Sequence, residues 1–180
     1  MTGPLAILIG PMAAGKTSVG RALASQLDVP FADLDALIAE AAGRSIPEIF
    51  AEEGEAAFRE LEAETLERAL HEHPGVLSLG GGAPLHPRSR ERLRGAPVIW
   101  LDVDEVIAAR RLAHGAGRPM LSGADPMARW RELTVARASC YRELAALRID
   151  AGRGSPSRVA RSILHLLQLD PPARPEKEIS

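Results

Sequence analysis

The sequence predicts a three-layer α/β fold, in which a five-stranded parallel sheet lies between two layers of helices. Short, continuously apolar runs recur along the chain and alternate with longer segments of helical periodicity. Strands that are apolar throughout are typical of a parallel sheet buried on both faces, and their alternation with helices indicates crossover connections. With 180 residues and 46% hydrophobic content, the chain can form one substantial core but not two average-sized domains.

Each element follows from this alternation. The strands are expected at residues 5–9, 29–33, 76–79, 98–101 and 147–150. Apolar residues recur at helical spacing in the segments that follow. The helices are expected at residues 16–27, 34–42, 46–53, 55–70, 106–111, 127–145 and 159–169. Ligands of such sheets bind beyond the carboxyl ends of the strands, so the residues that directly follow the strands are the candidates for function.

Two segments are expected to be mobile. Residues 112–125 are rich in glycine and proline and too long for a tight turn, which indicates a lid. Residues 170–180 lack apolar content and are expected to form a disordered tail. The remainder, residues 1–169, is expected to form a single domain. No apolar run reaches 18 residues and no leader peptide is evident, so we expect a cytoplasmic protein without a membrane partner.

The formal charge of −2 conceals two regions of opposite charge. Residues 28–72 contain 13 acidic residues and three arginines, whereas residues 84–158 contain 14 arginines and eight acidic residues. The basic half is where phosphate is expected to bind. Nucleic acid is not an expected partner, because aromatic residues for base stacking are few and no nucleic-acid motif is present. The single cysteine, Cys140, and the scattered histidines argue against disulfides and a transition-metal site.

A phosphate-binding motif follows the first expected strand. Its residues fit G-x-x-x-x-G-K-[ST], in which the backbone N–H groups of the loop and of the next helix bind phosphate. Lys16 is expected to reach the terminal phosphates and Thr17 to bind Mg²⁺. Only two of the 22 basic residues are lysines, which indicates that a compact ammonium is needed at position 16. A chance match in a flexible turn is the alternative. The expected ATP-binding loop is Gly10, Pro11, Met12, Ala13, Ala14, Gly15, Lys16, Thr17 and Ser18.

Two aspartates, Asp33 and Asp35, close the second expected strand. Alternation along an extended segment aims both carboxylates in roughly the same direction, so one can serve Mg²⁺ and the other a substrate hydroxyl. The alternative is that Asp35 caps the next helix while Asp33 is a solvated loop acid.

Other candidates have equally plain alternatives. Arg59 can be a surface partner of Glu55 at i,i+4 spacing, and the glycines at 80–82 can form a merely flexible loop. Directly after a strand, however, three glycines also allow close approach of the backbone to a ligand. Arg118 in the expected lid can reach a transferring phosphoryl group on closure, or can simply be solvated.

Taken together, these segments resemble the shikimate kinase family over residues 5–169. The matching pieces are GPMAAGKTSVGRALA, FADLDALI, GRSIPEIFAEEGEAAFRELE, GVLSLGGGAPL, RRLAHGAGRPML and RASCYRELA. The resemblance implies a P-loop kinase fold like that of nucleoside monophosphate kinases, with a helical substrate-binding region at about residues 33–62 and a mobile lid. It implies Mg²⁺-assisted transfer of phosphate from ATP to shikimate, giving 3-phosphoshikimate for aromatic amino acid synthesis, by a monomer.

The resemblance also implies a role for each matching position. The implied catalytic residues are Lys16, Asp35 and Arg118. The implied ATP-binding residues beyond the loop are Arg111, Arg118, Arg153 and Pro156, with Arg111 beside adenine. The implied substrate-binding residues are Asp35, Arg59, Gly80, Gly81, Gly82 and Arg137, with the two arginines facing the substrate carboxylate. The implied Mg²⁺ ligands are Thr17 and, through water, Asp33.

One departure from the family pattern lies in the phosphate-binding loop. Ala13 stands where the family usually has glycine, so the loop is strained if its backbone needs a positive φ there. Two other functions remain open. A gluconate-type kinase would share the ATP half of the site, and a catalytically silent nucleotide-binding homologue would keep only the fold.

Overall fold

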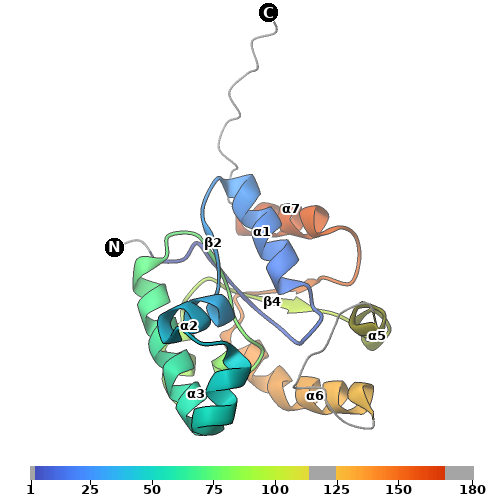
Figure 1. Cartoon of the computed structure of the whole chain (residues 1–180). Coiled ribbons are helices and arrows are strands. Elements are labelled where there is room, and N and C mark those ends of the chain that lie inside the picture. The colour runs from blue at the N-terminus through green and yellow to red at the C-terminus, as the bar shows by residue number, and fades with distance from the viewer. Residues whose placement is uncertain (1–2, 114–124, 169–180) are drawn as a thin grey trace, which may run out of the picture.

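The computed structural model describes residues 3–113 and 125–168. The expected lid, including Arg118, and the expected tail lie almost entirely outside these residues. The elements follow one another along the chain as shown in Figure 1. They are β1 (Ala6–Ile9), α1 (Lys16–Leu27), β2 (Phe31–Asp33), α2 (Leu34–Ala42), α3 (Ile46–Glu72), β3 (Val76–Ser78), the 3₁₀ helix η1 (Ala83–Leu85), α4 (Pro87–Leu93), β4 (Val98–Asp102), α5 (Glu105–Ala113), α6 (Pro126–Leu144), β5 (Leu147–Asp150) and α7 (Pro156–Leu167).

The predicted five-stranded parallel sheet is confirmed. Its strand order is β2-β3-β1-β4-β5, and every neighbouring pair is parallel. The carboxyl ends of β1, β2 and β3 therefore meet at one edge, where Ile9 leads into the phosphate-binding loop. The second strand is shorter than expected, because the N–H of Val29 still bonds to Ala24 at the end of α1 and Pro30 has no N–H to offer a neighbouring strand.

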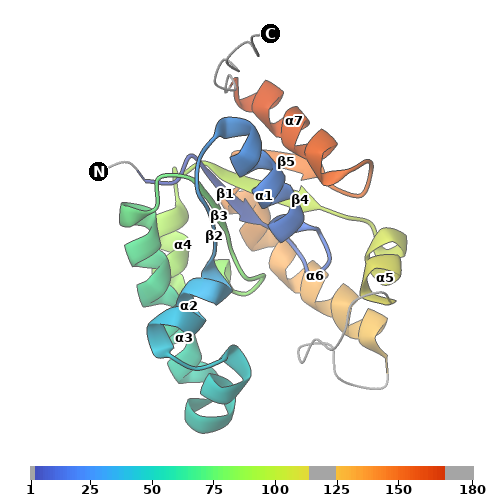
Figure 2. The same ribbon diagram turned by 45° about the horizontal axis from the view of Figure 1, so that its top comes forward.

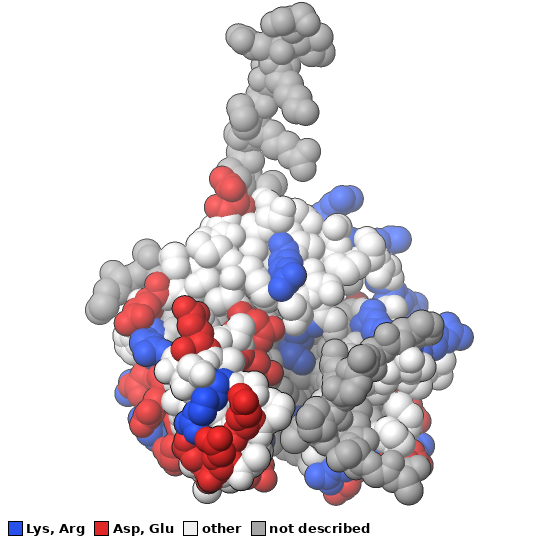
Figure 3. Space-filling model, in the orientation of Figure 1, with Lys and Arg blue, Asp and Glu red and all other residues white. Residues whose placement is uncertain are grey.

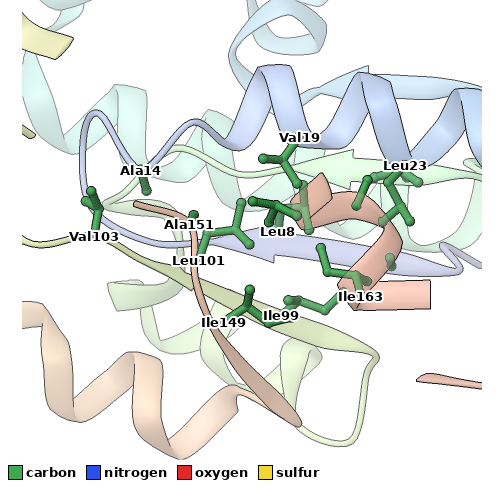
Figure 4. Packing of buried hydrophobic residues seen from close by; sticks show 14 of the residues in the cluster. Leu8, Ala14, Val19, Leu23, Ile99, Leu101, Val103, Ile149, Ala151 and Ile163 are labelled. Atoms are coloured by element: carbon green, nitrogen blue, oxygen red, sulfur yellow. The ribbon is translucent and has the colours of Figure 1, made fainter. Parts of the chain in front are cut away.

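Helices cover both faces of the sheet. Figures 1 and 2 show α1 and α7 above the sheet and α2, α3 and α6 below it. Residues of β1 alternate between the two layers, so that Leu8 joins the core beneath α1 and α7 while Ile7 joins the core against α3 and α6. Figure 4 shows the first of these cores, where Leu8 and Ile99 pack against Val19 and Ile163. Burial of every β1 side chain explains the unbroken apolar run in the sequence.

The break that the sequence predicts at residue 54 is confirmed. Helical segments lie on either side of Gly54, which adopts the non-helical angles φ 81° and ψ 176° within α3. This conformation strongly favours glycine. The helix begins with a capping box, in which Ser45 and Glu48 bond reciprocally to each other's backbone N–H.

Two short helices, η1 and α4, are not predicted by the sequence. Arginines dominate α4, and only Ser89 and Leu93 of its residues are buried, so its apolar periodicity is too weak to detect. Prolines begin α4 and lie in the first turn of η1, positions where proline is favoured because its missing N–H has no helical partner.

The charge asymmetry of the sequence persists on the surface. In Figure 3 the acidic side chains gather over the region that α2 and α3 occupy in Figure 1. None of the helices within residues 3–113 and 125–168 is long and apolar enough to cross a membrane.

Candidate active site

The phosphate-binding loop joins β1 to α1, as its sequence context predicts. Gly10 has φ 146°, and a Cβ there would overlap the carbonyl oxygen of Leu101, so only glycine fits. Gly15, with φ 88°, is the residue before the first turn of α1. The Lys16 ammonium lies over the loop and donates to the carbonyl oxygens of Gly10 and Pro11, both at 3.0 Å. Helix N–H groups and a lysine thus converge on one concavity, which is the arrangement that binds phosphate.

The backbone at Ala13 has a positive φ, the conformation in which alanine in place of the family's glycine is strained. Its φ is 65°, in the left-handed region, where a non-glycine residue costs about 1–2 kcal/mol. Two side chains hold the loop in this shape: Arg111 donates to the Ala13 carbonyl at 2.9 Å, and the Trp130 indole donates to Met12 at 2.8 Å. The loop therefore keeps a glycine-type backbone with an alanine in place.

Replacing Ala13 by glycine is expected to raise the free energy of unfolding by about 0.5–1 kcal/mol. Relief of the left-handed strain exceeds the entropy that the unfolded chain gains with glycine. The ATP Michaelis constant should change less than about threefold, because the backbone already has the required φ. Urea unfolding and steady-state kinetics measure both quantities. Ala14→Gly is the matched control: Ala14 is buried and has no positive φ, so this change should destabilise the protein. Equal losses in both variants would contradict the strain argument.

Thr17 and Asp33 lie next to each other at the entrance of the loop. The Thr17 hydroxyl donates to Asp33 Oδ2 at 3.0 Å. A hydroxyl and a carboxylate oxygen beside a phosphate site form the kind of donor set that Mg²⁺ uses, since this ion takes one or two protein oxygens and completes its shell with phosphates and water. The described residues contain no group of three or more His, Cys, Asp or Glu side chains that could hold a metal by themselves.

The two aspartates at the end of β2 do not fit the alternative in which Asp35 caps α2 and Asp33 is a solvated loop acid. Asp33, not Asp35, is the N-cap of α2, and its Oδ1 accepts the N–H of Asp35 at 3.2 Å. The helix-capping interpretation of Asp35 is therefore wrong, and its carboxylate is left to face the cavity described below. Protein atoms around that carboxylate displace water and raise its pKa; the charge of Asp33 adds to this effect, while Lys16 and Arg59 oppose it.

A cavity of about 160 Å³ lies between the loop, the start of α2 and helices α3 and α6. A wider groove of about 610 Å³ adjoins it and shares Phe50, Arg59, Gly82, Leu133 and Arg137 with it. Polar groups and apolar surfaces both line the cavity, a combination that suits a small polar ring. The lining residues are Pro11, Met12, Asp35, Ile46, Phe50, Phe58, Arg59, Glu62, Gly80, Gly81, Gly82, Trp130, Leu133, Thr134 and Arg137.

Arg59 lines the cavity and is held in place by Glu62, a residue to which the sequence analysis assigned no role. Arg59 bonds to Glu55 at 3.3 Å, as the surface alternative expects, but also to Glu62 at 2.7 Å. Glu62 is 1% exposed, and its burial raises its pKa despite the opposing charge of Arg59. A buried acid three residues after an arginine on a helix is the signal that could have revealed this pair.

Three glycines after β3 bring the backbone close to these side chains. A Cβ on Gly80 would lie 3.0 Å from Asp35 Oδ1, and one on Gly82 would lie 2.8 Å from the Arg59 guanidinium. A Cβ on Gly81 would lie 2.9 Å from a guanidinium nitrogen of Arg137. The glycines allow the backbone to approach these three side chains closely, and the flexible-loop alternative does not explain these distances.

Arg137 completes the wall from α6. The side chain is buried at 9% exposure and faces Gly81. Arg59 and Arg137 thus approach the same cavity from two helices and place two planar cations around it.

The expected nucleotide contacts farther from the loop are less closely assembled. Arg111 lies beside the loop, where it bonds to Ala13 and Ala151. Arg153 is 92% exposed and pairs with Asp150, and Pro156 begins α7. Arg118 lies outside the described residues.

Comparison with known proteins identifies the family. The model of a family described as shikimate kinase matches residues 12–168. A shikimate kinase of Rhodococcus jostii is 44% identical over 161 residues, which span 89% of this chain and 96% of the relative. The chain belongs to the shikimate kinase family. A solved shikimate kinase from Acinetobacter baumannii in complex with shikimate is 35% identical to this chain, with a TM-score of 0.86. The match covers 93% of this chain and 94% of the Acinetobacter chain.

A solved gluconokinase from Sinorhizobium meliloti is also similar in structure. It is 22% identical with a TM-score of 0.59, a likeness that extends to the fold alone. The P-loop kinase fold expected from the sequence is therefore confirmed, and the family match favours shikimate kinase over the gluconate-type alternative.

Proposed function

We propose that this protein is a shikimate kinase, which transfers the γ-phosphate of ATP to a ring hydroxyl of shikimate. The observation that carries this proposal is the cavity in which Asp35, Arg59 and Arg137 converge beside the phosphate-binding loop. A carboxylated ring alcohol needs a planar bidentate donor for its carboxylate and a hydrogen-bond acceptor for its hydroxyl. Both are present at one end of a phosphate site, and the whole chain is similar to shikimate kinases.

The reaction is an in-line displacement. The acceptor hydroxyl oxygen forms a bond to the γ-phosphorus, the bond between that phosphorus and the bridging oxygen breaks, and ADP leaves. Asp35 accepts the hydroxyl proton, while Lys16 turns from Gly10 and Pro11 to the phosphate oxygens and balances their charge. Arg59 and Arg137 hold the carboxylate, so the arriving hydroxyl is fixed in place before transfer. Arg118 is proposed to stabilise the phosphoryl group from the lid.

Thr17 and Asp33 would hold Mg²⁺ with the phosphates of ATP. Bound there, the ion would neutralise charge on the phosphate oxygens. In our proposal Thr17 would contribute a direct ligand and Asp33 would act through water, while Asp33 Oδ1 keeps its bond to the Asp35 N–H. Arg111, Arg153 and Pro156 are proposed to line the adenine end. Action as a monomer and a cytoplasmic location remain predictions.

A coupled assay of ADP release tests the proposal. ATP and Mg²⁺ would be supplied with shikimate, with gluconate, or without an acceptor. Turnover that depends on shikimate is expected, with little ADP release in the other two reactions. Turnover with gluconate but not with shikimate would show that the proposed acceptor is wrong. Tight ATP binding with no turnover on either acceptor would favour the catalytically silent homologue.

Replacing Arg59 by lysine is expected to raise the Michaelis constant for shikimate by about tenfold or more while leaving that for ATP nearly unchanged. Lysine keeps the charge but cannot bind a carboxylate and Glu62 with one planar fork. Steady-state kinetics with each substrate varied in turn measures the two constants. Arg68→Lys, at an exposed position of the same helix, is the control and should change neither constant. Equal increases in both constants for Arg59→Lys would argue against carboxylate recognition.

A further inference from the structure

The nucleotide loop and the acceptor loop meet at one point. A Cβ on Gly81 would lie only 3.4 Å from the carbonyl oxygen of Gly10, so the two backbones are already in close contact there. Gly10 belongs to the loop that is proposed to bind ATP, and Gly81 to the loop that is proposed to bind the acceptor. Their separation therefore affects the distance between the γ-phosphate and the attacking hydroxyl.

The Tyr141 hydroxyl lies at this meeting point. It donates to the Gly81 carbonyl at 2.6 Å, and the Gly10 carbonyl lies 3.4 Å away as a second acceptor. Tyr141 is 0% exposed, and burial raises its pKa to about 12 although Arg137 lowers it by charge and hydrogen bonding. The hydroxyl thus remains a proton donor at neutral pH and contacts both loops from one fixed atom.

The ring of Tyr141 is held firmly in the core. It packs within the cluster that joins α3, α6 and the sheet, with the Trp100 ring centroid 5.8 Å away. A buried aromatic ring has few alternative rotamers available, so its hydroxyl can hold the loops in place.

We infer that Tyr141 is a positioning residue that fixes the nucleotide loop against the acceptor loop and so aligns the γ-phosphate with the acceptor hydroxyl. This inference rests on the proposed function. It assigns Tyr141 a larger effect on the rate of transfer than on the affinity for either substrate, because alignment matters most when both substrates are bound.

Helix α6 offers two matched controls. Trp130, 5% exposed, donates its indole N–H to the Met12 carbonyl at 2.8 Å, so its hydrogen bond reaches the nucleotide loop and not the acceptor loop. Cys140, 3% exposed, donates its thiol to Pro84 at 3.2 Å, beyond the acceptor loop. Each control removes one buried hydrogen bond from the helix that carries Tyr141 without removing a link between the loops.

The first test is kinetic and uses the full chain. Tyr141→Phe removes the oxygen and keeps the ring. We expect kcat with shikimate to fall about tenfold or more, the Michaelis constant for ATP to stay within about threefold, and the Michaelis constant for shikimate to rise by a smaller factor than kcat falls, because Arg137 loses its hydrogen bond to the hydroxyl. Cys140→Ala should keep kcat within about twofold of the wild type, even if it lowers the melting temperature as much as Tyr141→Phe does. An unchanged kcat in Tyr141→Phe, or a fall shared equally by Cys140→Ala, would overturn the inference.

The second test does not depend on turnover. Hydrogen–deuterium exchange of the free protein should rise in Tyr141→Phe in both loops together, at residues 10–15 and 80–82. In Trp130→Phe the rise should be confined to residues 10–15, and in Cys140→Ala to residues 83–86. A rise in only one loop of Tyr141→Phe would overturn the inference. Absence of shikimate-dependent turnover in the wild type would overturn the proposed function, while this exchange pattern would still report whether Tyr141 links the loops.

Discussion

Replacing Asp35 by asparagine is expected to lower kcat with shikimate by about 10²–10⁴-fold, the range that a positioned general base contributes. The amide has nearly the same shape and can still accept a hydrogen bond from the acceptor hydroxyl, but it cannot take up the proton at neutral pH. The Michaelis constant for ATP should remain close to that of the wild type. Steady-state kinetics of the variant measures these constants, and Glu64→Gln, exposed on α3, is the control.

The pH dependence of kcat in the wild type provides a second test of Asp35 as the general base. Partial desolvation by the surrounding protein and the charge of the neighbouring Asp33 raise its pKa, so the ionised base is lost at a higher pH than an ordinary aspartate allows. Activity should be present above this raised pKa and fall as the pH drops through it. A kcat of Asp35→Asn within about tenfold of the wild type, with an unchanged acid limb, would contradict the role as base and leave Asp35 as a positioning group for the hydroxyl.

The same raised pKa has a consequence for stability. A carboxylate whose folded pKa exceeds its unfolded value favours folding at low pH and loses that contribution as the pH rises through the folded pKa. Ionised Asp35 therefore opposes folding at neutral pH, and Asp35→Asn should melt at a higher temperature than the wild type at pH 7. Thermal unfolding at pH 4 and pH 7 checks the sign, because the difference between the two proteins should shrink at the lower pH.

The elements that the sequence predicts well are those whose signal is local. The β1 strand, the phosphate loop and α1 are adjacent in the chain, and the motif that joins them depends on backbone geometry within a few residues. The strain at Ala13 could also be anticipated, because the motif fixes the backbone conformation of the loop, and a positive φ at this position strains alanine. By contrast, α4 was missed, because its residues face solvent and ion-pair with acids from other helices rather than form an apolar face.

The acceptor cavity was predictable in part. Asp35, Arg59 and Gly80 could be named from the family resemblance, but spacing alone left each with an ordinary structural alternative. Long-range packing brings α3 and α6 to the same edge of the sheet and so places these residues around one cavity, which spacing alone does not predict. Tyr141 was overlooked for that reason: its hydroxyl bonds to Gly81, 60 positions away along the chain, and no local pattern marks it. Glu62 does have a local signal, its i,i+3 spacing from Arg59, but its burial comes from the packing of α3 in the folded protein.

Replacing Lys16 by arginine is expected to lower kcat by about 10²–10³-fold, although the charge is kept. The Lys16 ammonium fits between the Gly10 and Pro11 carbonyl oxygens, 3.0 Å from each, so the loop accommodates a compact cation. A guanidinium is planar and wider, and it would press on the loop or meet the phosphates in the wrong place. Arginine serves as the cation at 20 of the 22 basic positions, which indicates that a compact ammonium is needed at position 16.

Steady-state kinetics and ATP binding of Lys16→Arg, beside Lys16→Met, separate charge from shape. If shape matters, both variants lose most of their turnover, and Lys16→Arg retains more of the ATP affinity because it keeps a cation near the phosphates. Arg21→Lys, exposed on the same helix, should retain full activity and show that exchanging the two cations does not harm α1 itself. Turnover of Lys16→Arg within about fivefold of the wild type would mean that charge alone suffices, and that the lysine at the start of α1 is not required for its size.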